Sequence, residues 1–397
     1  MSFQYDFETL KQAILFNTVE VLPTEEAKLD SEIKVLVEEA NKSGQVIKHY
    51  IGYEISGILH FGNNTYQMLK VAKLQQAGVQ CMVWLADYHT KINKKLDGKM
   101  STINKVAHEY FEPVIRKAVD VCGGDGSKLQ VLYAKDEYFR KNEDDLSFWD
   151  FEFEVEDYLS VNRVLRSLSI AGKEAGNESN YKLTRYPGMQ AADVFWHQTH
   201  LVQSGLDQRK IYVSCRDMAE KLDPEYQLKI GGKTVKPITM FTKLLLGMLP
   251  PQAATAGSTQ EAVSKMSKSR PDSAIFEHDS AEEITRKLKK AYCPMIEEND
   301  SQEIINEKLK ANPLLNWCEN LIFPAGKNIQ ISRPEKFGGD KTYTNFNEIY
   351  TDYLEGNLHP LDLKNGVAST LAEWFEPIRT WVEQNPEGLE LVKKARG

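Results

Sequence analysis

The stretch VIKHYIGYEISGILHFGNNTYQMLKVAKLQQAGVQCMVWL, residues 46–85, decides the fold of this chain. It begins with an apolar run at 46–53 and passes through a turn at 54–62. An amphipathic stretch follows and stops at Gly78, and glycine is a residue type that commonly ends helices. The next apolar run, at 79–85, is typical of a buried parallel strand. A strand, a turn, a helix and a strand in this order predict a βαβ unit.

The turn of this unit carries the sequence SGILHFGN, residues 56–63. Ligands of βαβ units bind at the carboxyl ends of the strands, beside the helix N-terminus. We expect His60 and the unpaired N–H groups of that helix end to donate to phosphate oxygens, while Gly62 leaves room for close approach. A single His-x-Gly is a weak signal, because an ordinary turn is its usual meaning.

A second signature, KMSKS, occupies residues 265–269. It follows a loop rich in proline and small residues at 250–258, which predicts a mobile connection. Lys265 and Lys268 on such a loop can fold over a triphosphate and stabilise the charge that develops as pyrophosphate leaves. A lysine-rich loop on its own is more often solvated surface, so this signature gains its meaning from the first one.

Length and composition narrow the class of protein. The chain has 397 residues, enough for two or three domains, and its net charge of −8 disfavours indiscriminate nucleic-acid binding without excluding a local RNA site. No apolar run reaches membrane-spanning length and residues 1–15 lack a signal-peptide core, so we expect a cytoplasmic protein without membrane contact. The five cysteines are scattered, and His197 and His200 lack a third ligand, so we expect neither disulfides nor a structural metal.

The two signatures, in this order, resemble the ATP-binding signatures of class I aminoacyl-tRNA synthetases. Over roughly residues 46–380 the chain resembles the tyrosyl-tRNA synthetases of the archaeal and eukaryotic type, in the segments YIGYE at 50–54, LADYH at 85–89, YPGMQAAD at 186–193, DQRKI at 207–211, RPEKFGGD at 333–340 and LHPLDLKN at 358–365. The resemblance implies a doubly wound α/β catalytic domain of the Rossmann type with a parallel sheet, followed by an α-helical anticodon-binding domain.

The resemblance also implies an amino-acid pocket. It places Tyr50 and Asp193 at the bottom of that pocket, where both hydrogen-bond the phenol of tyrosine. A carboxylate and a hydroxyl can pair with a phenolic O–H, whereas phenylalanine would leave them buried and unpaired. Core packing of the tyrosine and a solvated helix position for the aspartate are the alternatives. The remaining expected tyrosine-binding residues are Tyr186, Gln190, Gln208 and His89, the first three around the substrate ammonium group.

For ATP, the resemblance implies contacts from Gly52, Glu54, His60, Gly62, Asn63, Lys265, Met266, Ser267, Lys268 and Ser269. The expected catalytic residues are His60, Lys265 and Lys268, because they can stabilise charge in the transition state. No side chain is needed as a covalent nucleophile. The sequence departs from the family at Asn63, where a second histidine is usual, although an amide can still donate to a phosphate or ribose.

We divide the chain into a catalytic domain with an N-terminal helical extension at 1–262, the KMSKS loop with a linker at 263–306, and a helical domain at 307–397. In the last part, apolar residues recur every three or four positions from Leu363 to Trp381. This spacing predicts the buried stripe of one helix, bent at Pro377.

Two regions for tRNA follow from the resemblance. Phe337, His359 and Asp362 are expected around the first anticodon base. The two rings can stack on the base, and the carboxylate can accept a hydrogen bond from its Watson–Crick edge. The alternative is that Phe337 belongs to the core and that Asp362 is a helix N-cap. The residues expected at the acceptor end are Arg166, Arg209 and Lys210.

The implied activity is that of a tyrosine–tRNA ligase. ATP with Mg²⁺ activates L-tyrosine to tyrosyl-adenylate, and the tyrosyl group then passes to the 3′-terminal adenosine of tRNA(Tyr). The family also implies a homodimer. A tryptophanyl-tRNA synthetase shares the architecture but needs a partner for an indole N–H, and a catalytically silent RNA-binding paralogue is the alternative outside enzymes.

Overall fold

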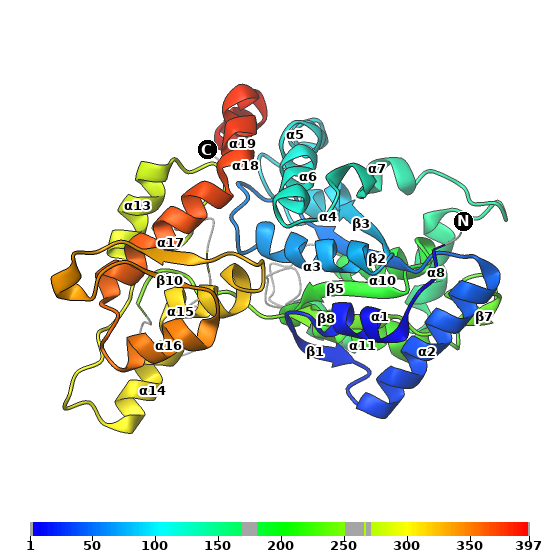
Figure 1. Cartoon of the computed structure of the whole chain (residues 1–397). Coiled ribbons are helices and arrows are strands. Elements are labelled where there is room, and N and C mark those ends of the chain that lie inside the picture. Colours follow the sequence, from blue (N-terminus) through cyan, green and yellow to red (C-terminus); the bar gives the residue numbers. More distant parts are fainter. Residues whose placement is uncertain (1–2, 169–180, 251–265, 267–270, 396–397) are drawn as a thin grey trace.

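The fold is built around a central sheet. A computed structural model describes residues 3–168, 181–250, 266 and 271–395 of the chain. The strand order of the sheet is β1-β8-β5-β2-β3-β4, and every neighbouring pair is parallel except β1 with β8 (Figure 1). The strands are β1 (Thr18–Leu22), β2 (Lys48–Tyr53), β3 (Gln80–Leu85), β4 (Gln130–Tyr133), β5 (Leu201–Gly205) and β8 (Ile238–Thr242). The predicted βαβ unit is β2, α3 (Thr65–Gln76) and β3, with Tyr53 opposite Leu85. The expected doubly wound α/β fold is confirmed.

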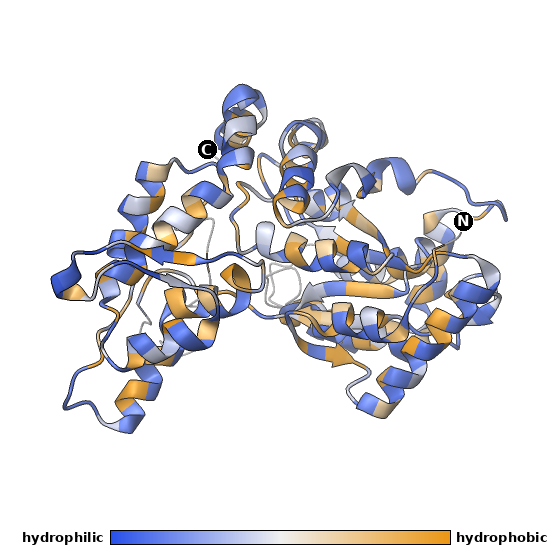
Figure 2. Ribbon diagram, in the orientation of Figure 1, coloured by the Kyte–Doolittle hydropathy of each residue, from blue (hydrophilic) through white to orange (hydrophobic). Residues whose placement is uncertain are grey.

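Helices cover both faces of this sheet. Successive residues of each strand point to opposite faces, so neighbouring residues of one strand belong to different cores. Ile51 of β2 belongs to the core beneath α1 (Phe7–Leu15), α2 (Glu26–Ser43), α3, α5 (Met100–Val106) and α6 (Glu112–Val121). Tyr50 belongs to the core beneath α8 (Phe148–Glu156), α10 (Tyr186–Trp196) and α11 (Arg209–Met218). Figure 2 shows hydrophobic residues along the central strands and mixed hydropathy on the outer helices. The shorter elements of this part are α4 (Asp87–Ile92), α7 (Ala134–Glu137), α9 (Val161–Ser167), β6 (Lys229–Ile230) and β7 (Lys233–Thr234).

The N-terminal segment differs from the helical extension that we expected. Besides α1 and α2 it contains β1, which pairs antiparallel with β8 at the sheet edge. The buried ammonium of Lys70 donates to the carbonyls of Ile14 and Phe16 and to the Thr18 hydroxyl, at 2.5, 2.7 and 2.8 Å. These contacts fasten the start of β1 to α3. The local pattern missed this strand because its pairing partner lies more than two hundred residues away.

The C-terminal part contains more than helices. Its elements are α13 (Ala281–Lys290), α14 (Gln302–Lys310), α15 (Pro313–Trp317), α16 (Phe346–Leu354), α17 (Pro360–Trp374), α18 (Glu376–Gln384), α19 (Pro386–Ala395) and the hairpin of β9 (Ile329–Ile331) and β10 (Lys341–Tyr343). The single bent helix that we expected is two helices, α17 and α18, which separate at Phe375. Pro377 explains the break, because proline fits the first turn of a helix but cannot donate within a continuing one.

The chain end returns to the catalytic part. The indole N–H of Trp374 donates to the carbonyl of Val121 at 2.9 Å, and α18 and α19 contact α6 and α5 (Figure 1). Helix α13, which we had assigned to the linker, packs against α17. The predicted domain limits at 262 and 307 remain predictions, and both lobes share one continuous hydrophobic core.

Candidate active site

A cavity of about 400 Å³ lies at the carboxyl ends of β2 and β5. The chain leaves β2 towards β3 and leaves β5 towards β8 on the other side, so this is the switch point at which doubly wound sheets bind ligands. The predicted site residues that line the cavity are Tyr50, Gly52, Glu54, His60, Gly62, Asn63, His89, Tyr186, Gln190, Asp193, Gln208 and Met266. The residues expected for tyrosine and those expected for ATP therefore meet in one cavity.

Four residues of the second signature, Lys265, Ser267, Lys268 and Ser269, lie outside the described residues. The fifth, Met266, packs against the first signature. If Gly62 carried a Cβ atom, that atom would stand 2.9 Å from the sulfur of Met266. The close approach of the two signatures therefore depends on the glycine.

A buried carboxyl group forms one end of the cavity. Asp193, only 1% exposed, accepts a hydrogen bond from the Tyr138 hydroxyl at 3.0 Å, and the Tyr50 hydroxyl lies 3.5 Å from its other oxygen. Burial raises the pKa of Asp193 well above its ordinary value. A Cβ atom at Gly52 would stand 2.9 Å from the Tyr50 hydroxyl, so glycine is what leaves room for that hydroxyl.

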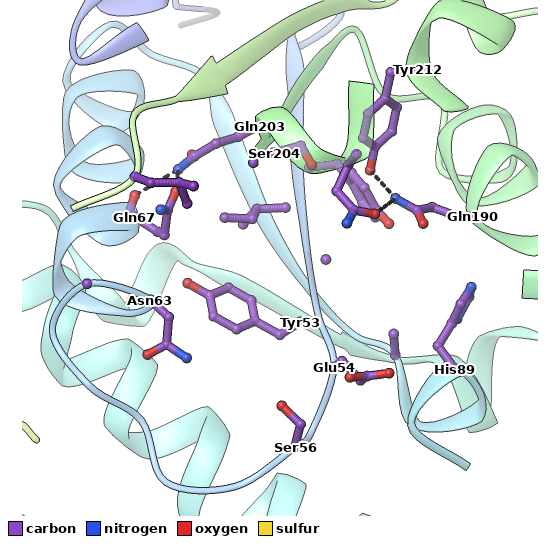
Figure 3. A pocket seen from close by; sticks show the side chains of 18 of the residues that line it. Tyr53, Glu54, Ser56, Asn63, Gln67, His89, Gln190, Gln203, Ser204 and Tyr212 are labelled. Carbon is purple, nitrogen blue, oxygen red and sulfur yellow. Dashed lines mark hydrogen bonds between the residues drawn. The ribbon is translucent and has the colours of Figure 1, made fainter. Parts of the chain in front are cut away.

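A group of neutral polar side chains lines the same cavity (Figure 3). The Gln190 amide nitrogen donates to the Tyr212 hydroxyl at 3.1 Å and to the side-chain oxygen of Gln208 at 3.2 Å. The rings of His89 and Tyr186 meet edge to face with centroids 4.4 Å apart. Burial lowers the pKa of His89 to about 4, so its ring is neutral at pH 7.

The N-terminus of α3 does not face the cavity as an open anion site, and our expectation for it was wrong. Glu277, 1% exposed, accepts hydrogen bonds from the Thr65 N–H at 2.8 Å, the Asn64 amide at 2.7 Å and the Thr65 hydroxyl. The N–H groups of Asn63 and Asn64 both donate to the His60 carbonyl at 3.0 Å. An internal carboxylate thus occupies the place that we had given to a phosphate.

Asn63 has a structural role in the turn. Its side-chain oxygen accepts from the His60 N–H at 2.9 Å, so its amide N–H₂ group remains as the part able to donate elsewhere. The isolated bridge between His60 and Phe276 ties the same turn to the segment that follows the second signature.

Several residues of this site carry no signal in the motifs of the sequence. Tyr138, Tyr212, Gln67 and Gln203 contact predicted residues or line the cavity. Tyr212 was detectable, because it follows Gln208 by four positions at the start of α11 and so shares its side of the helix. The others come from separate elements, and no local signal marked them.

The residues expected for tRNA fall into two separate groups. The Lys210 ammonium donates to the Arg166 carbonyl at 3.1 Å, and Arg209 pairs with Glu20 of β1 at 2.6 Å. These three basic residues therefore lie around the start of α11 and the end of α9.

In the C-terminal lobe, Phe337 is 63% exposed, which rules out the core alternative. The N-cap of α17 is His359, whose Nδ1 accepts from the Leu361 N–H at 3.1 Å, so Asp362 is not the N-cap. Asp362 instead lies 3.6 Å from the Arg333 guanidinium.

The described part of the chain contains neither a metal-binding cluster nor a membrane-spanning helix. There, no three His, Cys, Asp or Glu side chains are grouped so as to hold a metal ion. No described helix is both long and apolar enough to cross a membrane.

Known proteins resemble this chain over almost its whole length. The family model of tRNA synthetases class I (W and Y) matches residues 42–376. The tyrosine–tRNA ligase of Thermococcus sibiricus is 40% identical, covering 94% of this chain and 96% of that protein, and the one of Pyrococcus abyssi is 38% identical, covering 96% and 97%. The crystal structure of Pyrococcus horikoshii tyrosyl-tRNA synthetase complexed with L-tyrosine has a TM-score of 0.85 at 37% identity, covering 98% and 99%. The chain therefore belongs to the class I tRNA synthetases of the tryptophan and tyrosine group.

Proposed function

We propose that this chain is a tyrosine–tRNA ligase. The observation that carries the proposal is the buried carboxyl of Asp193, with the Tyr50 hydroxyl 3.5 Å from it, in the wall of the cavity. Together these groups offer an acceptor and a donor to a phenol, whereas an indole has a single N–H to donate. The names of the relatives, which match over nearly their full length, support tyrosine over tryptophan.

The substrate ammonium group has a suitable acceptor. The side-chain oxygen of Gln190 is buried and has no hydrogen-bond partner among the described residues. Its amide nitrogen is held by Tyr212 and Gln208, so the oxygen has a fixed direction. An unpaired buried acceptor is unfavourable, and an ammonium donor would satisfy it. Tyr186, His89 and Gln208 complete the proposed surroundings of the amino acid.

ATP, with Mg²⁺ bound to its phosphates, would occupy the rest of the cavity. The tyrosine carboxylate attacks the α-phosphorus, the bond to the bridging oxygen breaks, and pyrophosphate leaves with its charge stabilised by donors. We assign this stabilisation to His60, Lys265 and Lys268, with Gly52, Glu54, Gly62 and Asn63 beside the nucleotide. Because Glu277 occupies the end of α3, these side chains would act without the open helix N-terminus that we first expected.

We further propose a cytoplasmic homodimer that binds tRNA(Tyr) through the two groups of residues described above. Helices α8 and α9 expose Phe153 and Val161, 75% and 74% accessible, and exposed apolar side chains on adjoining segments favour a protein contact. The exposed ring of Phe337 is available for stacking on a base.

The proposal is tested by ATP–pyrophosphate exchange with each of the twenty amino acids. We expect exchange with tyrosine, followed by charging of tRNA(Tyr). Exchange with tryptophan alone would make the chain a tryptophanyl-tRNA synthetase. Absence of exchange, with retained tRNA binding, would favour the silent RNA-binding paralogue.

A further inference from the structure

Gln67 of α3 lines the cavity, although it belongs to neither signature. Figure 3 shows Gln67 and Asn63 on one side of the cavity, and Gln190, Tyr212 and His89 on the other. The cavity wall also includes Leu244 and Leu245, apolar side chains that suit a planar base. With tyrosine at the Asp193 end, Gln67 lies on the side left for ATP.

The orientation of the Gln67 amide follows from its neighbours. The Gln203 side-chain nitrogen lies 3.1 Å from the Gln67 backbone carbonyl, which can only accept, so this end of Gln203 must be its N–H₂ group. The same nitrogen lies 2.9 Å from the Gln67 side chain, whose facing atom must then be its oxygen. The Thr242 hydroxyl lies 3.1 Å from that oxygen and 3.3 Å from the Ser204 backbone carbonyl, so these two acceptors share its single proton.

The contact of the Gln203 side-chain oxygen agrees with this assignment of the amide. That oxygen lies 3.1 Å from Nε2 of His49, a fully buried ring. Burial lowers the pKa of His49 to about 3, so the ring is neutral, and Nε2 can carry its single proton and donate to Gln203. The chain of donors therefore runs from His49 through Gln203 to Gln67.

The result is a side chain that can only donate. The Gln203 amide donates to the Gln67 oxygen with the Thr242 hydroxyl beside it, and the Gln67 amide nitrogen makes no hydrogen bond to any described residue. We propose that Gln67 donates a hydrogen bond to the nucleoside half of ATP, to a ring nitrogen of adenine or a ribose oxygen, and that Gln203 and Thr242 hold its amide in the donating orientation. This inference rests on the proposed function, since it needs ATP in this cavity.

Two variants test the donor. Gln67→Leu removes the hydrogen bond, and we expect the KM for ATP in tyrosine-dependent exchange to rise roughly 3- to 10-fold while the KM for tyrosine stays unchanged. Gln67→Glu keeps the inner oxygen and the shape but turns an oxygen towards the ATP acceptor, so its KM for ATP should rise at least as much. The matched control is Gln76→Leu at the other end of α3, where the amide donates to Gly123 outside the cavity.

ATP analogues identify the acceptor. The 1-deaza, 3-deaza and 7-deaza forms each replace one ring nitrogen by C–H, and the 2′-deoxy and 3′-deoxy forms each lack one ribose hydroxyl. We expect one analogue to have a higher KM than ATP with the wild type. With Gln67→Leu, that analogue and ATP should have the same KM. An unchanged KM for ATP in either variant, or equal responses of wild type and variant to every analogue, would overturn the inference. Absence of tyrosine-dependent exchange in the wild type would instead overturn the proposed function, and the inference with it.

Discussion

The Tyr138 hydroxyl donates a 3.0 Å hydrogen bond to one oxygen of the Asp193 carboxyl. The Tyr138 ring is fully buried and stacks on Phe148 with centroids 3.7 Å apart, so the hydroxyl is held in place. This contact engages one oxygen of Asp193 and leaves the other to face Tyr50. The acceptor proposed for the substrate phenol is therefore oriented by a residue from outside every signature.

Tyr138→Phe should erode the discrimination between tyrosine and phenylalanine. The substitution removes one hydrogen bond to the buried carboxyl of Asp193, an effect of about 1–3 kcal/mol, and allows the carboxyl to rotate. The measurement is the ratio of kcat/KM for the two amino acids in exchange. Tyr343→Phe is the control, since it removes a hydroxyl that donates to Asp352 at 2.6 Å in the C-terminal lobe. A wild-type ratio in Tyr138→Phe would contradict the role given to this contact.

Gly52→Ala should weaken tyrosine binding. The new methyl group would stand 2.9 Å from the Tyr50 hydroxyl and force it away from Asp193. We expect the tyrosine Kd to rise about tenfold, equivalent to the roughly 1 kcal/mol of one hydrogen bond plus local strain. Gly188→Ala on α10 is the matched control, because its Cβ would make an ordinary 3.5 Å contact with Glu156. Equal Kd values for the two variants would count against the steric argument.

Glu277→Ala should destabilise the fold and slow tyrosine activation together. It leaves the Asn64 amide and the Thr65 N–H buried without a partner, at about 1–3 kcal/mol for each group. Urea unfolding and exchange rates measure the two effects. Ser301→Ala removes an exposed cap of α14 and should lose only roughly 1 kcal/mol. If both variants lose the same stability, Glu277 is not the anchor that the contacts indicate.

The free energy of unfolding should fall as pH rises from about 4 to about 7, because Asp87 titrates in this range in the folded chain. Burial raises the pKa of Asp87 to about 7, whereas an unfolded aspartate titrates near roughly 3.9. The folded chain therefore binds more protons than the unfolded chain in this window, and its stability falls with pH. Asp87→Asn should flatten that slope and still accept the Lys135 N–H that Asp87 accepts at 3.1 Å.

Urea unfolding between pH 5 and 8 measures the slope. The control is Asp125→Asn, because hydrogen bonds from Ser127 and Lys128 lower the pKa of exposed Asp125 to about 2, below the window. Identical slopes in the wild type and Asp87→Asn would show that Asp87 does not titrate there.

Asp362→Ala should weaken charging of tRNA while leaving tyrosine activation intact. A hydrogen bond from a base to a carboxylate is worth about 1.5–3 kcal/mol, so kcat/KM for charging should fall roughly 10- to 100-fold. The decisive assay uses tRNAs altered only at the first anticodon base. Glu355→Ala is the control, an exposed acid of the same lobe that accepts from Asn357 at 3.1 Å. If wild type and Asp362→Ala respond alike to the base change, Asp362 does not read that base.

Several features were predictable because their causes are local. The βαβ unit follows from two apolar runs around an amphipathic stretch, and the cavity lies where such a unit places a ligand. The cap of α13 by Ser280, which accepts from the Glu283 N–H at 3.2 Å, likewise follows from residues three positions apart. The resemblance to the family indicated which residues surround the substrate amino acid, and three of them, Tyr50, Gln190 and Asp193, line one cavity.

The sequence by itself thus determined the fold class, the place of the cavity along the chain and the family. Only the tertiary structure decided that Glu277 fills the end of α3, that Tyr138 contacts Asp193, and that Gln203 contacts the Gln67 side chain. The members of these pairs are 55 to 212 residues apart. Buried polar groups must find partners, and which partner is within reach depends on how distant segments pack, a quantity that no local pattern contains.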